Sequence, residues 1–253
     1  MKTFLLPIFL LVPIAACSSS SNVTPVGTTP DAGDPDAGAV DAPAGGPQCS
    51  TARDQLLLPI DKTSTGAVTI LSDTGGKKTI YVDASAGGFQ TAAKSPRIYL
   101  DLGAGTRVAV TDKSASSSTA WDLGLKRYVI FTNSGDVGSG GGGAVQIPKA
   151  FASVTDGEVT AASPAAESMF DADCNAKLDR TQAPLTTFSD WYDYDDATMI
   201  PSPKANVTYV VRGGTGRLYK VAIKAYDALP DGGSRNNMST GFFLLEVTEV
   251  TAK

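Results

Sequence analysis

Residues 171–179 carry oxygen-bearing side chains at regular spacing. They are the first candidate for a metal-binding site. Four of them, all Asp or Asn, follow the spacing of the first ligands in a calcium-binding loop. Such a loop also needs a glycine at its sixth position and a glutamate at its twelfth, where this chain has Ala176 and Gln182. The pattern therefore favours a solvated acidic loop, and we predict no metal site.

A second group of carboxylates, within residues 190–196, surrounds the aromatic residues Trp191, Tyr192 and Tyr194. Paired carboxylates beside aromatic rings occur in glycosidases, where one acts as an acid and the other as a base or nucleophile. They also line solvated loops, which is far commoner. We therefore interpret this group as a polar loop whose aromatic rings could form the walls of a ligand pocket.

The chain contains no histidine, which excludes imidazole catalysis and most zinc sites. A serine or cysteine nucleophile would lack its usual base. Outside the N-terminal segment described below, the chain has 20 basic and 22 acidic residues, with no basic stripe for nucleic acid. These absences favour a binding protein over an enzyme, and they argue against nucleic acid as a partner.

Short alternating segments of apolar and polar residues must position these side chains. They recur along the chain with Gly, Asp and Ser turns between them, at residues 98–102, 209–211, 219–225 and 243–247. Alternation with period two is typical of strands that are buried on one face. We therefore predict an all-β domain, an antiparallel sandwich or curved sheet with long irregular loops.

The stretch at residues 121–144 is the most informative part of this pattern. Its first half, to Thr132, alternates as one long half-buried strand. Its second half is rich in glycine, which tolerates a positive φ and predicts an adaptable loop at one end of the sheet.

Residues 150–206 are turn-rich and polar, with aromatic residues that we expect to be exposed. Helical periodicity is nearly absent, and residues 161–173 have room for a short helix at best. An irregular region of this length in a small domain is usually functional. We therefore expect the ligand to bind here.

The N-terminus has the pattern of an export signal followed by a lipid anchor. Residues 1–16 contain a basic start, a short apolar run and small residues before Cys17. This arrangement is typical of a bacterial lipobox, in which the cysteine is diacylated and anchors the protein in a membrane. Residues 17–48 are rich in Asp, Pro, Gly and Ser and predict a disordered spacer. The folded domain is then residues 49–253.

Two cysteines, Cys49 and Cys174, remain after the lipobox. In an exported chain, an even number of cysteines favours a disulfide, and here it would join the start of the domain to a distant loop. Two buried free thiols are the alternative.

The central stretch also resembles a known family. Trp121-Asp122, Arg127-Tyr128, Asn133-Ser134-Gly135 and the glycines before Ala144 are similar to the signature of the HmuY-like family of bacterial lipoproteins. Two weaker segments, at residues 82–85 and 209–227, agree with it. The resemblance covers roughly residues 78–250. It implies the all-β fold, an outer-membrane lipoprotein of the cell envelope, and haem as the ligand.

In the family, two axial side chains from the middle region hold the haem iron. Histidine cannot fill that role here, and by position the matching residues are Met169 and Met199. Thioether sulfur is an accepted haem ligand, although methionine also fills gaps in apolar cores. Met238 is a weaker candidate, and a Tyr192 or Tyr194 phenolate is another option.

Two functional hypotheses follow from the resemblance. In the first, the protein binds haem or another flat apolar ligand between its loops, with Trp191, Tyr192 and Tyr194 as pocket walls. In the second, a protein of the same fold has lost haem binding and contacts a glycan or a protein partner.

Overall fold

A computed structural model describes residues 49–197, 200–235 and 240–251. The predicted signal peptide, Cys17, the spacer, Met199 and Met238 lie outside these ranges. In the described part, twelve strands form three antiparallel sheets. No helix in these ranges is long and apolar enough to cross a membrane. The prediction of an all-β antiparallel fold is confirmed.

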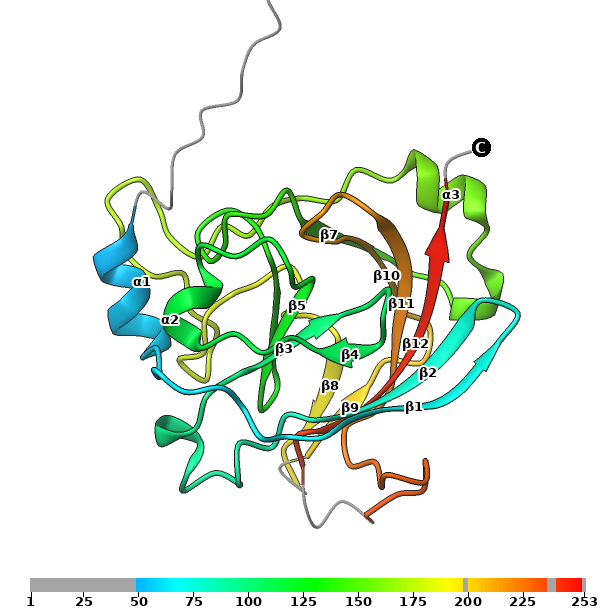
Figure 1. Cartoon of the computed structure of the whole chain (residues 1–253), viewed down its shortest axis with the longest axis horizontal. Coiled ribbons are helices and arrows are strands. Elements are labelled where there is room, and N and C mark those ends of the chain that lie inside the picture. Colours follow the sequence, from blue (N-terminus) through cyan, green and yellow to red (C-terminus); the bar gives the residue numbers. More distant parts are fainter. Residues whose placement is uncertain (1–48, 198–199, 236–239, 252–253) are drawn as a thin grey trace, which may run out of the picture. The chain divides into compact units, whose positions relative to one another are not determined.

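The largest sheet has six strands, and its order places distant segments side by side (Figure 1). Across the sheet the strands are β1 (Val68–Thr74), β2 (Lys77–Asp83), β12 (Phe242–Val250), β11 (Leu218–Ala225), β10 (Thr208–Arg212) and β7 (Gly143–Ile147). The C-terminal strand thus lies between β2 and β11. All of these pairs are antiparallel.

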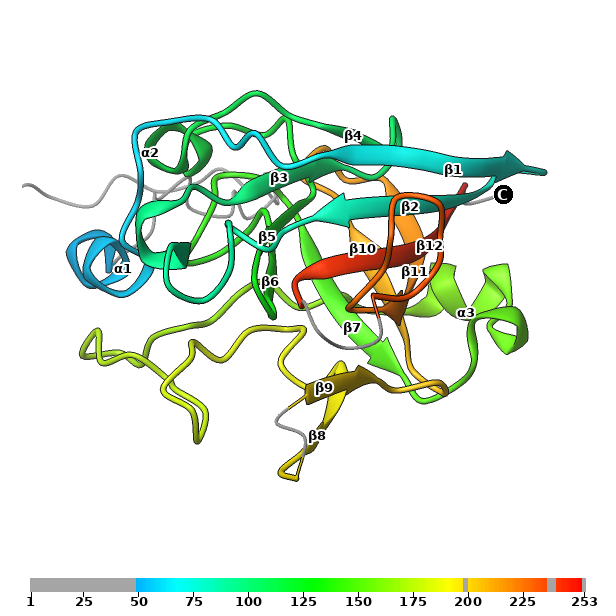
Figure 2. The same ribbon diagram turned by 90° about the horizontal axis from the view of Figure 1, so that it is seen from below.

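A four-stranded sheet and a separate hairpin complete the β structure (Figure 2). The four strands are, in order, β4 (Thr106–Arg107), β3 (Ile98–Asp101), β5 (Leu123–Lys126) and β6 (Val129–Thr132). The hairpin consists of β8 (Tyr192–Asp195) and β9 (Ile200–Pro203). The short helices are α1 (Ser50–Leu57), α2 (Asp112–Ala115), α3 (Asp156–Ala161), η1 (Ala92–Lys94) and η2 (Phe151–Ser153).

The two larger sheets share one hydrophobic core. Its buried side chains come from β2, β10, β11 and β12 of one sheet and from β3, β5 and β6 of the other. A second cluster around Trp121 and the Cys49–Cys174 disulfide lies apart from this core, and a third lies under α3. The architecture is therefore a sandwich with additional apolar clusters beside its sheets.

The prediction of one long strand at residues 121–132 is wrong. The chain turns at Arg127 and Tyr128, so that Lys126 pairs with Val129 and Gly124 pairs with Phe131. Arg127 adopts a left-handed φ of 54° to make this turn. Such turns usually carry Asn or Gly, and Arg127 and Tyr128 lack this usual composition of a hairpin turn.

The turn also changes which faces are buried. Leu123, Leu125 and Ile130 point into the shared core, whereas Trp121 and Phe131 lie in the second cluster. The strand pair is therefore buried on both faces rather than half-buried, because each face packs against a different apolar cluster.

The glycine-rich loop after β6 packs closely around Asn133. A Cβ atom on Gly138, Gly140 or Gly142 would come within 2.1, 2.7 and 2.6 Å of Asn133 atoms. The Asn133 side-chain oxygen accepts a hydrogen bond from Gly140 N–H at 3.0 Å, and its backbone oxygen accepts one from Gly142 N–H at 3.0 Å. Close packing, rather than adaptability, explains these glycines.

The short helix lies earlier than predicted. Helix α3 ends at Ala161, and residues 162–173 continue without a helix. Its start is a capping box, in which Thr155 accepts a hydrogen bond from Glu158 N–H and Glu158 accepts one from Thr155 N–H. This pairing satisfies two donors at the first turn and fixes where the helix begins.

Lys126 offers a test of the buried hairpin. Burial and the charge of Arg97 lower the pKa of its ammonium group to about 8, from an ordinary 10.5. Between about pH 8 and pH 10.5 the unfolded chain binds more protons than the folded chain does, so the free energy of unfolding rises with pH in this range. Lys126→Met should raise the free energy of unfolding by about 1 kcal/mol at pH 7, after allowance for partial exposure.

Denaturant unfolding at several pH values would measure this difference. The gain should shrink toward pH 10.5, because the wild-type lysine is then neutral in both states. Lys62→Met, at an exposed position, is the matched control and should change little. A Lys126→Met protein that is less stable at every pH would contradict the expectation.

Candidate ligand-binding site

A disulfide attaches the irregular middle region to the start of the domain. Cys49 and Cys174 are bonded, with their Cα atoms 5.4 Å apart and a sequence separation of 125. This confirms the predicted disulfide. Met169 and Phe170 pack in the same apolar cluster as Cys49. The bond therefore fixes the segment around residue 170 against the second cluster.

Glu167 provides a second attachment inside the protein. Its carboxylate accepts hydrogen bonds from Thr132 N–H at 2.8 Å, Thr187 N–H at 2.9 Å and the Thr187 hydroxyl at 2.7 Å. Burial raises the pKa of this carboxyl, and the hydrogen bonds oppose that rise. Glu167 thereby ties both ends of the segment at residues 167–187 to strand β6.

The aromatic residues expected to be exposed in this region are mostly buried. Phe170, Phe188 and Trp191 are 5%, 0% and 1% exposed. Phe188 stacks on Tyr209 of β10, with ring centroids 4.2 Å apart. The Trp191 indole N–H donates to the Tyr128 carbonyl oxygen at 3.0 Å. The prediction of exposure is wrong for these three, because long-range packing covers them.

Two of the three predicted pocket aromatics line a surface hollow beside the β8–β9 hairpin. Tyr192 and Tyr194 border a cavity of about 240 Å³, together with Arg180 and the loop near Asp179. Trp191 supports this surface from the core, with its ring centroid 4.8 Å from that of Tyr192. We call this cavity the tyrosine hollow.

Tyr128 extends the aromatic surface from the tip of the β5–β6 hairpin. Its ring is edge-on to Tyr192, with centroids 6.1 Å apart. Its hydroxyl is 3.1 Å from the Thr181 hydroxyl across the adjoining cleft. The hairpin turn and the β8–β9 hairpin, far apart in sequence, therefore build one aromatic surface.

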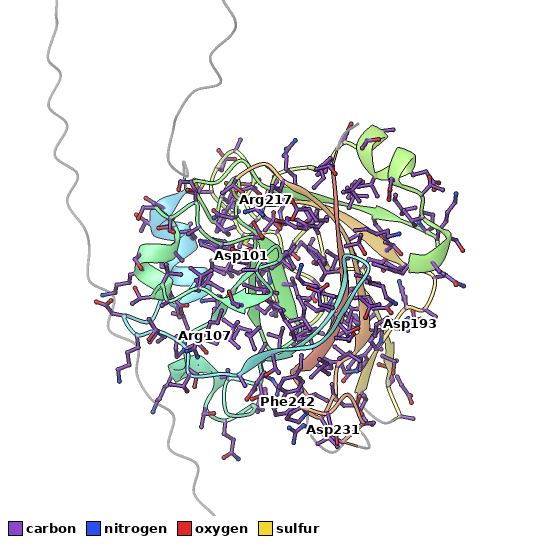
Figure 3. All side chains as sticks on the ribbon, turned by 45° about the vertical axis from the view of Figure 1, so that its right-hand side comes forward. Asp101, Arg107, Asp193, Arg217, Asp231 and Phe242 are labelled. Carbon is purple, nitrogen blue, oxygen red and sulfur yellow. A yellow bond between two sulfur atoms is a disulfide. The ribbon has the colours of Figure 1, made fainter. Side chains whose placement is uncertain are left out.

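Charges of both signs surround the tyrosine hollow. The Arg180 guanidinium lies over the Tyr194 ring at 5.5 Å, whereas Asp179 and Asp193 contribute carboxylates to the lining. Asp193 lies on β8 at the edge of the domain (Figure 3). Burial raises the pKa of the Tyr192 phenol, with a further rise from Asp179, so this phenol resists ionisation. The hollow thus suits a ligand with a flat face and groups that donate hydrogen bonds.

The acidic loop at residues 171–179 uses its oxygens locally. The Asp171 carboxylate accepts hydrogen bonds from Asp173 N–H at 3.0 Å and Asn175 N–H at 2.8 Å. A further hydrogen bond from the Asn175 side-chain amide at 3.0 Å contributes most to lowering the pKa of Asp171, and the two backbone bonds lower it further. Within the described ranges, no group of three or more Asp, Glu, Cys or His side chains is placed to hold a metal ion.

Comparison with known families assigns the fold. The family model described as HmuY protein matches residues 93–241, more than half of the 253-residue chain. The chain belongs to the HmuY family. This confirms the resemblance of the central stretch, and members of this family are binding proteins. No curated protein matches the chain.

Solved structures similar to this HmuY-family protein come from bacteria. A candidate lipoprotein of Bacteroides fragilis has 14% identity and a TM-score of 0.43, covering 76% of this chain and 97% of its own. A candidate HmuY-like haem-binding protein of Bacteroides vulgatus has 15% identity and a TM-score of 0.42, covering 76% and 100%. An apo HmuY analogue of Tannerella forsythia has 14% identity and a TM-score of 0.42, with the same coverage.

The candidate haem ligands of this HmuY-family protein lie in different surroundings. Met169 is 0% exposed and packs among the residues of the second cluster. Its backbone N–H donates to the Asp136 carboxylate at 2.7 Å, and its carbonyl accepts from Lys177 N–H at 2.7 Å. Met199 lies outside the described residues, on the chain between β8 and β9. The thioether of Met169 does not face the tyrosine hollow.

Sequence reasoning missed Arg180, which lines the tyrosine hollow, and Tyr128, which lines the adjoining cleft. A signal for the hairpin turn does exist in the sequence. Trp121, Leu123, Leu125, Val129 and Phe131 occupy alternate positions, and the one charged residue on that parity is the arginine between Leu125 and Val129. A charge at an otherwise apolar position marks a place where the chain leaves the core.

Proposed function

We propose that this HmuY-family chain is a binding lipoprotein of the bacterial cell envelope that performs no reaction on its ligand. The sequence pattern around Cys17 supports a diacylated N-terminus in the outer membrane, and the Asp- and Pro-rich spacer that follows would separate the domain from the lipid. The absence of histidine in the whole chain supports a binding role over imidazole-based catalysis.

The ligand class that we propose is haem or a comparable flat, largely apolar molecule at the tyrosine hollow. The observation that carries this proposal is the convergence of Tyr128, Tyr192 and Tyr194 on one surface beside a cavity of about 240 Å³. Pockets that enclose a drug-sized ligand have volumes of roughly 300–1,000 Å³. A haem at this surface would therefore be held by one face or edge and remain partly open to solvent.

The described residues fit a tyrosine ligand better than a pair of methionines. Tyr194 is 39% exposed on β8, and a tyrosine oxygen is an established axial ligand of haem iron. Met169 would have to leave a closed apolar cluster before its sulfur could reach a ligand at this surface. Bound haem would supply an iron centre for coordination, while Arg180 offers a cation for one propionate.

Titration with haemin tests the proposal. The purified domain should shift the haemin Soret band at micromolar concentration, and Tyr192→Phe with Tyr194→Phe should weaken binding at least tenfold. Tyr81→Phe is the matched control, because Tyr81 lies on β2 and does not line the hollow. Met169→Ala with Met199→Ala should leave the shift in place. A shift lost in the methionine variant alone would favour methionine ligation, and no shift at all would reject haem.

One observation favours a second ligand class. Asp179 and Asp193 lie in the lining, where they repel the carboxylates of a porphyrin but accept hydrogen bonds from hydroxyl groups. An exposed aromatic ring beside such acceptors suits a sugar ring. If haemin causes no shift, oligosaccharide binding that is lost in both Tyr194→Ala and Asp193→Ala would identify a glycan ligand at the same hollow.

A further inference from the structure

A second hollow, larger than the tyrosine hollow, lies beside Arg127 of the β5–β6 turn. It has a volume of about 490 Å³ and is lined by Arg127, Phe89, Phe242, Thr240, Ser85 and two glycines. Phe242 begins β12 at the lower edge of the domain (Figure 3). We call this cavity the arginine hollow. The adjacent turn residues Arg127 and Tyr128 thus line different cavities.

Arg127 is held firmly at the wall of this hollow. Its backbone N–H donates to the Ala84 carbonyl oxygen at 2.7 Å, which supports its left-handed φ of 54°. Its guanidinium donates to the Thr240 carbonyl oxygen at 2.9 Å and to the Thr240 hydroxyl at 3.1 Å. A guanidinium has five N–H donors, so donors remain for a ligand. A strained backbone at a fixed charged residue is a feature of binding sites.

Aromatic rings form the apolar wall. Phe89 is 86% exposed, the highest value among the large apolar residues in the described ranges. The Arg235 guanidinium lies over the Phe242 ring at 3.9 Å and holds that ring in place. Arg235 is itself fixed by a hydrogen bond from its Nε to the Ala228 carbonyl oxygen at 3.0 Å. The hollow therefore combines the fixed ring of Phe242, the exposed ring of Phe89 and the fixed cation of Arg127.

The charge of the arginine hollow differs from that of the tyrosine hollow. Among the described residues that line it, Arg127 is the one that carries a charge, and none is a carboxylate. The tyrosine hollow has Arg180 together with Asp179 and Asp193. A planar guanidinium binds a carboxylate through two parallel hydrogen bonds, and aromatic walls bind a flat apolar body.

We propose that the arginine hollow is a binding site for small flat aromatic carboxylates, with Arg127 binding the carboxylate and Phe89 and Phe242 enclosing the ring system. This site is separate from the tyrosine hollow and does not depend on the function proposed above. A ligand here needs neither iron nor an axial side chain.

Calorimetric titration with 2-naphthoate, which contains no metal, tests the site. The domain should bind 2-naphthoate at sub-millimolar concentration, and Arg127→Met should weaken binding at least tenfold. Binding of the neutral 2-naphthamide should not depend on Arg127. Phe89→Ser should weaken binding of both probes, and its exposed position means that the fold should not suffer. Arg180→Met and Tyr194→Phe, at the tyrosine hollow, are the matched controls and should bind as the wild type does.

The outcomes separate the two sites. Undetectable 2-naphthoate binding to the wild type at millimolar concentration would overturn the proposal. So would unchanged binding in a folded Arg127→Met protein, or weakened binding in Tyr194→Phe, which would place the probe in the tyrosine hollow. If Arg127→Met fails to fold, Phe89→Ser decides alone, and unchanged binding there rejects the site. Haemin binding at the tyrosine hollow can fail or succeed independently of these results.

Discussion

Replacing both Cys49 and Cys174 with serine is expected to lower the free energy of unfolding by about 4 to 5 kcal/mol. The bond closes a loop with 125 residues of sequence separation, and in the chain-entropy model a loop of this length strongly restricts the unfolded state. Loss of packing adds to this effect, because Cys49 lies in the second cluster with Trp121 and Met169. Denaturant unfolding of the oxidised wild type and the variant would measure the difference.

The wild type under reducing conditions is the matched control for the serine variant. It should show nearly the same loss of stability, because it breaks the bond without changing the cysteine side chains. A loss below 1 kcal/mol in both proteins would mean that the second cluster alone holds the start of the domain in place. A loss of stability in the serine variant but not in the reduced wild type would mean that the cysteine side chains stabilise the domain by packing and not through the disulfide bond.

Glu167→Ala is the second change with a large expected effect, a loss of at least about 3 kcal/mol. The substitution removes an acceptor from the buried Thr132 N–H and from the N–H and hydroxyl of Thr187. Each buried donor left without a partner costs about 1–3 kcal/mol. Because the segment at residues 167–187 is attached through this carboxylate, the tyrosine hollow should also lose its shape. Chemical denaturation and near-ultraviolet circular dichroism would detect both effects.

Glu158→Ala is the control for Glu167→Ala. Glu158 is also a carboxylate that accepts hydrogen bonds from a threonine, but it caps the solvent-facing start of α3. Its loss should cost much less stability, because water can replace the carboxylate as an acceptor at this exposed helix start. Equal losses at the two positions would mean that burial of Glu167 has no particular energetic importance.

The all-β class was predictable because alternation of apolar residues is a local property of strands. Segments such as β11 and β12 bury alternate residues in the shared core, as their sequences predict. The alternation failed at residues 121–132 for a physical reason. The two-residue turn pairs Lys126 with Val129 and so shifts the alternation by one position, which moves the core-facing residues from Leu125 to Ile130. Val129 and Phe131 are apolar as well, because they face the second cluster, so the apolar residues continue at odd positions and hide the turn.

The candidate site was predictable in region but not in detail. The aromatic residues near β8 were found because they stand out in a polar segment, and Tyr192 and Tyr194 do line a hollow. Trp191 could not be separated from them by sequence, because its burial depends on Tyr226 and Phe243, which are distant in the chain. The burial of Met169 depends in the same way on Trp121 and the disulfide.

The residue types and their order were enough to predict the fold class and the HmuY family and to favour the pairing of Cys49 with Cys174, because each depends on composition, spacing or a continuous motif. Packing between distant segments settled which side chains reach the surface. It placed Arg127 at the arginine hollow and Tyr128 at the cleft beside the tyrosine hollow, and it enclosed Met169. Side-chain direction depends on strand register, and burial depends on neighbours far along the chain.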